Sequence, residues 1–245
     1  MKKFHFTKIS IALFFVVLFS TCKKENLCDC IKRTGTIVTE TRAITGFDSI
    51  VALDNMNVFI MQDPNFEVKV EAGKNIVPLI TTEVVNGTLT ISNNNRCNWT
   101  RSYDKPFNVY IKMPVVHCVT SNGTGNVKSL NTITTNELSI WIKNSGNIEL
   151  IVNNSKVTTQ IFGAGDVTLQ GATTNHYCDI GGTAFLNCKD LQTNYTWVHT
   201  FTTGLCYVTT TNLACRIDYI GDLYCYGNPV IDEKTLTSTG QLYLK

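Results

Sequence analysis

The sequence lacks the short motifs that mark most catalytic and metal-binding sites. It has only four histidines, and none of them belongs to an H-x-H or H-E-x-x-H pattern. It contains ten cysteines but no C-x-x-C pair of the kind that zinc sites commonly use. A G-x-S-x-G nucleophile motif is absent as well. We therefore expect no metal and no cofactor, and no residue stands out as catalytic.

Long apolar runs are also scarce, and the clearest one lies at the N-terminus. Lys2, Lys3 and Lys8 precede the run "ISIALFFVVLF", which is too short to span a bilayer well and suits the apolar region of a signal peptide. The run leads into "FSTC", which resembles the lipobox of bacterial lipoproteins, where Cys22 would be acylated. The alternative is an ordinary signal peptide that is cut nearby, in which case Cys22 has no special role.

These features predict a signal peptide at residues 1–21, a tether at 22–35 and a single domain at 36–245. Acylation of Cys22 would hold the protein to a membrane of the cell envelope. The outer membrane is the expected location, and the sequence does not decide between its periplasmic and its surface face. Removal of residues 1–21 takes away three lysines and no acidic residue. The formal charge therefore changes from +2 to −1, with 18 basic against 19 acidic residues. A chain without a basic excess is not expected to bind nucleic acid.

Glycines recur in the second half of the chain at a nearly constant spacing. In "GTGNVKSL", "NSGNIEL" and "GAGDVTL", a glycine is followed by Asn or Asp and then by alternating apolar and polar residues. Seven such anchor glycines lie about 19 residues apart: Gly125, Gly146, Gly165, Gly182, Gly204, Gly221 and Gly240. A repeat near 20 residues with strand-like alternation is typical of a β-solenoid. Because no helical pattern and no Lys-Ser/Thr pair follow these glycines, they indicate chain corners and not a phosphate-binding loop.

Residues at even distances from the anchor glycines are expected to point into the core. This parity applies to five cysteines, which we interpret as small apolar core residues: Cys178, Cys188, Cys206, Cys215 and Cys225. It also predicts that His176 is a core residue. Adjacent coils can bring two thiols together, so the sequence does not decide whether any of these cysteines form disulfides. For Cys28 and Cys30 in the tether we favour oxidation or exposure over metal binding.

Residues 36–120 alternate without the glycine register and form a β-rich N-terminal portion before the glycine-repeat solenoid at 121–245. Four segments in it read as strands, "NVFIMQ", "FEVKVEA", "GTLTISN" and "FNVYIKMP". Only "NIVPLITTEVV" has room for a helical turn, and Pro78 shortens it. The predicted fold class is all-β, a β-solenoid with coils of about 19 residues preceded by this portion.

An ordered series of segments resembles a known family. The series is "GFDSI" at 46–50, "FEVKVEAGKNI" at 66–76, "NGTLTIS" at 86–92, "VYIKMP" at 109–114, and then "SNGTGNV". Over residues 36–245 the chain is similar to bacterial auto-transporter adhesins of the head GIN domain family. The resemblance implies a β-helix-like envelope protein, commonly a lipoprotein, without established catalytic residues. The chain departs from the family pattern in its many cysteines and in the irregular repeats around Gly182 and Gly204.

Two aspartates are candidates for a catalytic pair, because polysaccharide lyases and hydrolases also use β-helices. Asp179 and Asp218 each lie three residues before an anchor glycine, and Phe201 has that position on the coil between them. Two coil spacings would separate the carboxylates by about 9 to 10 Å, which inverting glycosidases tolerate. A carbohydrate-active β-helix enzyme is therefore the alternative to a non-catalytic binding module. Asp166 and Asp222 directly follow anchor glycines and are interpreted as structural corner residues.

The most suggestive feature is aromatic. Three residues after the last four anchor glycines, an outward position is occupied by Phe185, Tyr207, Tyr224 and Tyr243. A row of exposed rings favours a surface that binds a glycan or a protein partner. In the alternative interpretation the rings form a stacked ladder that stabilises neighbouring coils. The sequence therefore predicts an envelope lipoprotein that acts as an adhesin or binding module, and an oligomer is also possible.

Overall fold

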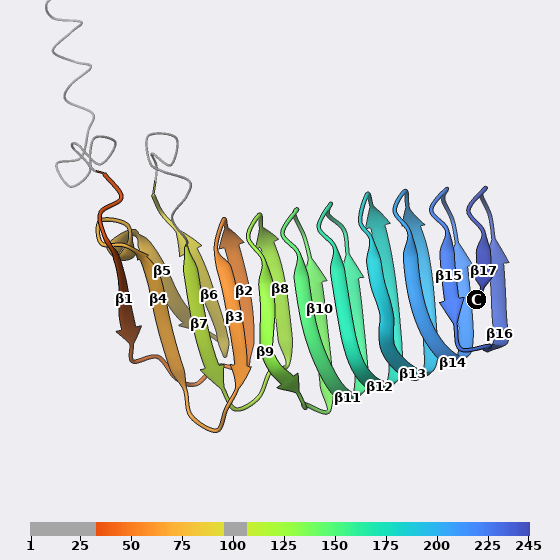
Figure 1. Cartoon of the computed structure of the whole chain (residues 1–245), viewed down its shortest axis with the longest axis horizontal. Coiled ribbons are helices and arrows are strands. Elements are labelled where there is room, and N and C mark those ends of the chain that lie inside the picture. The colour runs from red at the N-terminus through yellow and green to blue at the C-terminus, as the bar shows by residue number, and fades with distance from the viewer. Residues whose placement is uncertain (1–32, 96–106) are drawn as a thin grey trace, which may run out of the picture.

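The computed structural model describes residues 33–95 and 107–245, and these form one continuous stack of strands (Figure 1). In this range all 17 strands belong to one hydrogen-bonded array. The strands of the N-terminal part are β1 (Ile37–Arg42), β2 (Ser49–Asp54), β3 (Asn57–Gln62), β4 (Glu67–Gly73), β5 (Ile80–Val85), β6 (Thr88–Asn93) and β7 (Asn108–Met113). The 3₁₀ turn η2 (Val77–Leu79) has a proline in its first turn and leads directly into β5. The four predicted strands in this region are confirmed.

The remaining strands build the coils of a solenoid. They are β8 (Cys118–Gly123), β9 (Val127–Ile133), β10 (Glu137–Ile142), β11 (Ile148–Ile161), β12 (Val167–Gly182), β13 (Leu186–Thr202), β14 (Cys206–Ile217), β15 (Leu223–Tyr226), β16 (Val230–Leu236) and β17 (Leu242–Leu244). All of their pairings with one another are parallel. The predicted β-solenoid with coils of about 19 residues is confirmed.

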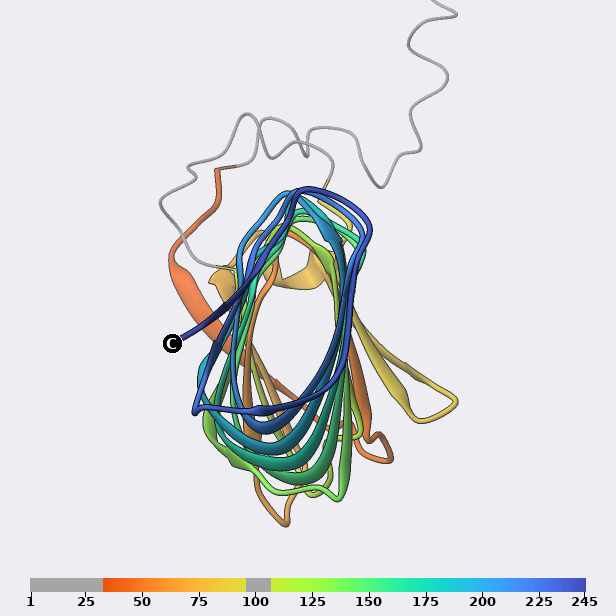
Figure 2. The ribbon, with the colours of Figure 1, turned by 90° about the vertical axis from the view of Figure 1, so that its right-hand side faces the viewer.

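Each coil contributes to two outer faces. The first face consists of β9, β15, β17 and the first halves of β11 to β14, whereas the second face consists of β8, β10, β16 and the second halves of those long strands. Along the stack, the coils superimpose as an elongated ring with two long sides (Figure 2). Outward-pointing side chains on the two faces therefore point away from each other.

Parallel ladders also extend before residue 121. Strand β2 pairs in parallel with β8, and β3 pairs in parallel with β9. Beyond them, β2 and β3 pair in parallel with β6 and β7. The antiparallel strands β1, β4 and β5 are added at this end of the stack.

The core is a column of apolar side chains that repeats once per coil. On the first face the column includes Ile148, Val167, Leu186, Cys206 and Leu223, all of them fully buried. The five predicted core cysteines are buried and carry free thiols, which confirms the parity argument. Burial raises the pKa of the Cys206 and Cys225 thiols to about 12, so these thiols stay protonated at neutral pH.

One detail of the predicted register is wrong. The corner position between Gly165 and Gly204 belongs to Ala184, and not to Gly182. A Cβ atom added to Gly204 would clash with the carbonyl oxygen of Ala184, just as one on Gly165 would clash with that of Gly146. Gly182 lies two residues earlier and has a φ of +73°, a conformation that glycine adopts without strain. A shift of two residues keeps the alternation of inward and outward side chains. Burial was therefore predicted correctly, while some outward columns were not.

Candidate functional site

Three tyrosines on consecutive coils form a stack on the first face, here called the tyrosine column: Tyr207 of β14, Tyr224 of β15 and Tyr243 of β17. Strand pairing places Tyr207 opposite Tyr224 and Tyr224 opposite Tyr243. The first two ring centroids are 5.3 Å apart at an interplanar angle of 25°, and the next two are 4.9 Å apart at 19°. The rings are therefore stacked almost face to face along the solenoid axis.

Phe185 does not belong to this column, which corrects the sequence prediction. The position opposite Tyr207 on the preceding coil is occupied by Asn187, which in turn lies opposite Thr168. Phe185 lies two residues earlier, beside the corner, and its backbone N–H donates a hydrogen bond of 2.9 Å to Asp166 Oδ1. The sequence analysis placed Phe185 in the column because it took Gly182, and not Ala184, as the corner residue of this coil. Phe185 is nevertheless 45% exposed.

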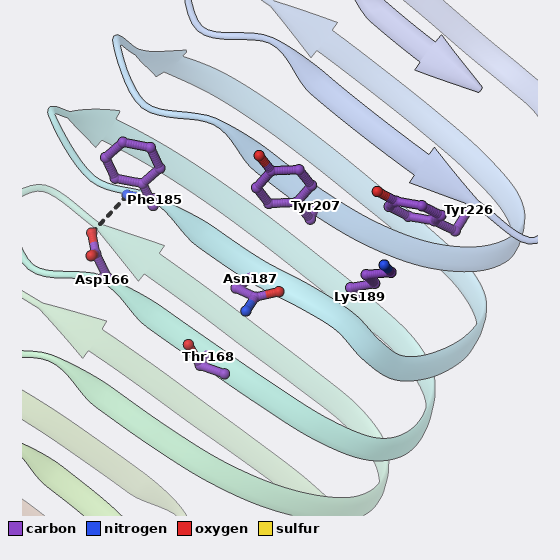
Figure 3. Close-up of a pocket in the computed structure, with 7 residues that line it drawn as sticks. All are labelled: Asp166, Thr168, Phe185, Asn187, Lys189, Tyr207 and Tyr226. Carbon is purple, nitrogen blue, oxygen red and sulfur yellow. Dashed lines mark hydrogen bonds between the residues drawn. The ribbon is translucent and has the colours of Figure 1, made fainter. Parts of the chain in front are cut away.

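Phe185 and Tyr207 line a common hollow of about 430 Å³, together with Asp166, Thr168, Asn187, Lys189 and Tyr226. Figure 3 shows the rings of Phe185, Tyr207 and Tyr226 in one row, with the polar side chains in a second row beside them. The hollow thus combines apolar ring surfaces with an amide, a hydroxyl, a carboxylate and an ammonium group, so it can hold a ligand that has both apolar surface and hydrogen-bonding groups.

Two lysines lie against the aromatic rings of the first face. Lys189 Nζ is 4.8 Å from the ring centroid of Tyr226, and Lys245 Nζ is 5.8 Å and 6.0 Å from those of Tyr224 and Tyr243. These distances are within the range of cation–π attraction. Partial burial raises the pKa of the Tyr224 phenol, so this hydroxyl can donate a hydrogen bond at neutral pH.

Asp166 and Asp222 take the structural role expected from their corner positions. Asp166 accepts the hydrogen bond from Phe185 N described above, and Asp222 Oδ1 accepts one of 2.8 Å from Gln241 N. In both cases a carboxylate satisfies a backbone donor on the following coil. Such bonds hold neighbouring corners together.

The second face carries a polar network that the sequence reasoning missed. His199 lies between two aspartates: its Nδ1 is 3.0 Å from Asp179 Oδ1 and its Nε2 is 3.1 Å from Asp218 Oδ2. Arg216 Nε is 2.7 Å from Asp218 Oδ2, and the Thr237 hydroxyl donates a bond of 2.7 Å to Asp218 Oδ1. The network joins four successive coils.

The positions predicted for the two aspartates were therefore wrong in part. His199, and not Phe201, lies opposite Asp179 on the next coil, and Phe201 lies opposite Gly181. The cause is again the assignment of Gly182 as the corner residue, two positions before the true corner at Ala184. The separations Asp179 to His199 and His199 to Asp218 are each close to one coil length, and this spacing is the signal that would have found the network.

Asp218 is held in its charged form. The hydrogen bond from Thr237 and the contact with Arg216 are the largest influences, and they lower its pKa to about 2. Asp218 is thus a permanent acceptor at neutral pH. It has no proton to donate to a leaving group.

Aromatic side chains surround this network and form a second cluster, here called the aromatic band. Trp197 and Phe201 flank His199 along β13, with ring centroids 5.9 Å and 5.2 Å from the imidazole. Phe162 is 6.4 Å from Phe201, and Trp141 is 6.4 Å from Phe162. On the neighbouring strand β12, Tyr177 lies opposite Trp197, and its ring centroid is 6.1 Å from that of Tyr195. The band consists of Trp141, Phe162, Tyr177, Tyr195, Trp197 and Phe201.

The buried histidine is separate from both surfaces. His176 is completely buried, and its Nε2 is 2.9 Å from the hydroxyl of Thr159, which confirms the predicted core position. Among residues 33–95 and 107–245, no group of three or more His, Cys, Asp or Glu side chains is arranged to hold a metal ion. Over the same range no helix is long and apolar enough to cross a membrane. Cys22, Cys28 and Cys30 lie outside the described residues.

The parallel coils and the ring-lined outer faces define the class as a β-solenoid with exposed aromatic surfaces. Residues 46–229 match the family described as "Putative auto-transporter adhesin, head GIN domain". Because this match covers most of the chain, the protein belongs to that family, and the resemblance found in the sequence is confirmed.

Solved structures show the same fold. A crystal structure of a putative adhesin from Bacteroides fragilis has a TM-score of 0.80 at 21% identity, covering 87% of this chain and all of that chain. A putative adhesin from Parabacteroides distasonis has a TM-score of 0.68 at 16% identity, with the same coverage of 87% and 100%. A putative lipid binding protein from the same organism has a TM-score of 0.69 at 17% identity and also covers 87% of this chain and 100% of its own. A search of the curated proteins found no match.

Proposed function

We propose that this protein is a non-catalytic binding module of the cell envelope, an adhesin that holds an extended glycan on its first face. The observation that carries the proposal is the tyrosine column with the adjoining ring-lined hollow. Membership in the adhesin family supports a binding role in general. A protein partner's edge is the alternative occupant of the same surface.

The chemistry of the surface suits a sugar chain. The apolar C–H faces of sugar rings stack on aromatic rings, and their hydroxyls need hydrogen-bonding groups at the side. Tyr207 offers the ring, while Asn187, Thr168 and Lys189 border the same hollow. The column runs along the solenoid axis, so a bound chain would lie across successive coils about 4.8 Å apart.

The experiment compares ring losses at two places on the same face. Tyr207→Ser with Tyr224→Ser removes two rings of the column, and we expect retention on a glycan array to fall at least about tenfold, or about 1.4 kcal/mol. Tyr110→Ser is the matched control, because Tyr110 stacks on Phe59 at 5.0 Å and 17° on strands β7 and β3. The control should lose stability but keep binding. If the tyrosine-column variant binds every glycan as well as the wild type does, the rings are only a stabilising ladder and the proposal fails.

We further propose that Cys22 is acylated and anchors the protein in the envelope. The support is the lipobox-like "FSTC" after the apolar run, since acyl chains provide membrane affinity. Cys22→Ala should move the protein from the membrane fraction to the soluble fraction, or leave it unprocessed. Unchanged partitioning of this variant, with no labelling of the wild type by a fatty-acid probe, would exclude the anchor.

A carbohydrate-active enzyme is the second candidate function, and the Asp179–His199–Asp218 network is the observation in its favour. A glycosidase needs a protonated carboxyl group beside an ionised one. Asp218 stays ionised because its pKa is about 2, and Asp179 is paired with the imidazole. The geometry therefore favours binding over hydrolysis. Release of reducing ends or unsaturated products from polysaccharides, abolished by Asp218→Asn, would reverse this conclusion.

A further inference from the structure

The aromatic band on the second face has six rings against the three of the tyrosine column, and its neighbouring rings are tilted by 36° to 57° instead of stacked. Phe201 extends across Gly181 of the preceding coil: a Cβ atom added to Gly181 would clash with the Phe201 ring. Absence of a side chain at Gly181 thus lets the ring lie on the sheet. Phe162, 6.4 Å away, is 50% exposed and continues this platform.

Beside the platform, the polar network is fixed and still has hydrogen-bonding capacity. His199 lies between two carboxylates and is hydrogen-bonded to Asp218, which is also held by Arg216 and Thr237. Arg216 uses only Nε for this, and its side chain is 53% exposed. Within the described part of the chain, its terminal nitrogens make no hydrogen bond. A guanidinium that is oriented but not saturated presents donors to a ligand.

The network has no excess of positive charge. Two carboxylates face a single guanidinium, with the imidazole between them, so the cluster offers no excess positive charge to an anion. A phosphate-bearing ligand would meet Asp179 and Asp218, and a lipid chain would cover the unused guanidinium nitrogens of Arg216 without offering them an acceptor. A neutral sugar has apolar faces for the rings and hydroxyls for Asp179 and Arg216.

From this combination we infer a second carbohydrate site, which binds neutral sugar residues over Phe201 and Phe162 with hydrogen bonds to the Asp179–His199–Asp218–Arg216 network. It faces away from the tyrosine column, because the two lie on opposite faces of the coils (Figure 2). The inference extends the proposed function, which concerns the first face alone. A protein with both sites would cross-link polysaccharide chains.

The test uses the full-length protein and affinity electrophoresis through gels that contain a mannan, a xylan or a β-glucan, with polygalacturonate as the anionic comparison. Phe201→Ser with Arg216→Gln should weaken binding to at least one neutral polysaccharide about tenfold. Gly181→Ala should have the same direction of effect, because it displaces the Phe201 ring while keeping every group proposed to contact the sugar. Lys74→Gln, an exposed change in the N-terminal part, is the control and should have no effect.

The variants of the two faces separate the two proposals. If the tyrosine-column variant loses binding and the second-face variants do not, the second site is refuted and the first stands. The reverse result supports the second site and refutes the first. Wild-type protein that no neutral polysaccharide retards refutes the second site, and so does a second-face loss that appears with polygalacturonate only. Sedimentable cross-linked polysaccharide, lost when either face is mutated, is the expected sign of two sites.

Discussion

Acid stability depends on His176, the histidine sealed inside the solenoid. The imidazole is completely buried, with the Thr159 hydroxyl at 2.9 Å and the Cys178 sulfur at 3.2 Å from Nε2. Burial lowers its pKa from 6.5 to about 3, because a charged ring would lose its hydration without gaining a counter-ion. The folded protein therefore keeps this ring neutral under conditions in which the unfolded chain protonates it.

The sign and size of the effect follow from the two pKa values. Between pH 6.5 and 3 the unfolded chain binds one proton more than the folded protein at this site, so the free energy of unfolding falls as the pH falls. Each pH unit corresponds to about 1.4 kcal/mol. The loss from His176 alone is thus about 2 kcal/mol at pH 5 and approaches about 5 kcal/mol near pH 3.

The assay is urea denaturation of the wild type and of His176→Gln at several pH values from 7.5 to 4. The variant will have its own stability at neutral pH, since a buried contact changes, but its stability should fall less steeply with acid. All surface carboxylates, Asp218 included, titrate in both proteins and cancel in the difference. A constant difference between the two proteins over the whole range would refute the reasoning. So would an imidazole NMR signal of His176 that titrates near pH 6.5 in the folded wild type.

Three further predictions concern the core, the corners and the column. Cys206, whose thiol is buried with a pKa raised to about 12, should resist thiol reagents in the native state, and rapid labelling measured by mass spectrometry would contradict the register. Gly165→Ala should lower the free energy of unfolding by about 1–3 kcal/mol, because the new Cβ meets backbone of the preceding coil; an unchanged urea midpoint would disprove the tight corner. Tyr207→Lys with Tyr224→Glu should restore a cross-coil contact and keep the melting temperature near that of the wild type, while glycan retention is lost. Retained binding by this pair would show that the rings are not the ligand contact.

The period and the parity of the coils could be read from the sequence because they depend on strong local constraints. A corner that packs backbone on backbone needs a small residue, and the strand after it must alternate to fill the core. Both constraints are visible at Gly125, Gly146 and Gly165. The N-terminal coil was harder to recognise, because β2 and β3 meet at Asp54 to Met56 without a glycine, and their parallel partners lie about 70 residues later.

The outward columns could be predicted only where the register was certain. Ala184 fills one corner in place of glycine, and the nearby Gly182 offered a plausible but incorrect anchor. An error of two residues leaves every inward residue inward, so nothing in the core pattern exposes the mistake. On the surface it exchanged Phe185 for Asn187 and concealed the contact between His199 and Asp179. The error affected the prediction of the candidate sites more than that of the fold, because both sites include residues of strands β12 and β13.

The outer column of the first face shows that the fold does not require aromatic residues there. At the start of the column Tyr110 and Phe59 are stacked at 5.0 Å, and Lys128 and Glu149 follow them and form an ion pair of 3.0 Å. The next two coils have Thr168 and Asn187, and rings return at Tyr207. The core beneath changes little along these coils, since its column of Val127, Ile148, Val167, Leu186, Cys206 and Leu223 is apolar and fully buried. The middle coils of the column are joined without rings, so the coil repeat alone does not explain the three stacked tyrosines of the C-terminal coils. Contact with a ligand that requires flat apolar surface would explain them, and the ring-lined hollow beside Tyr207 favours the C-terminal coils over the Tyr110–Phe59 pair as the binding end.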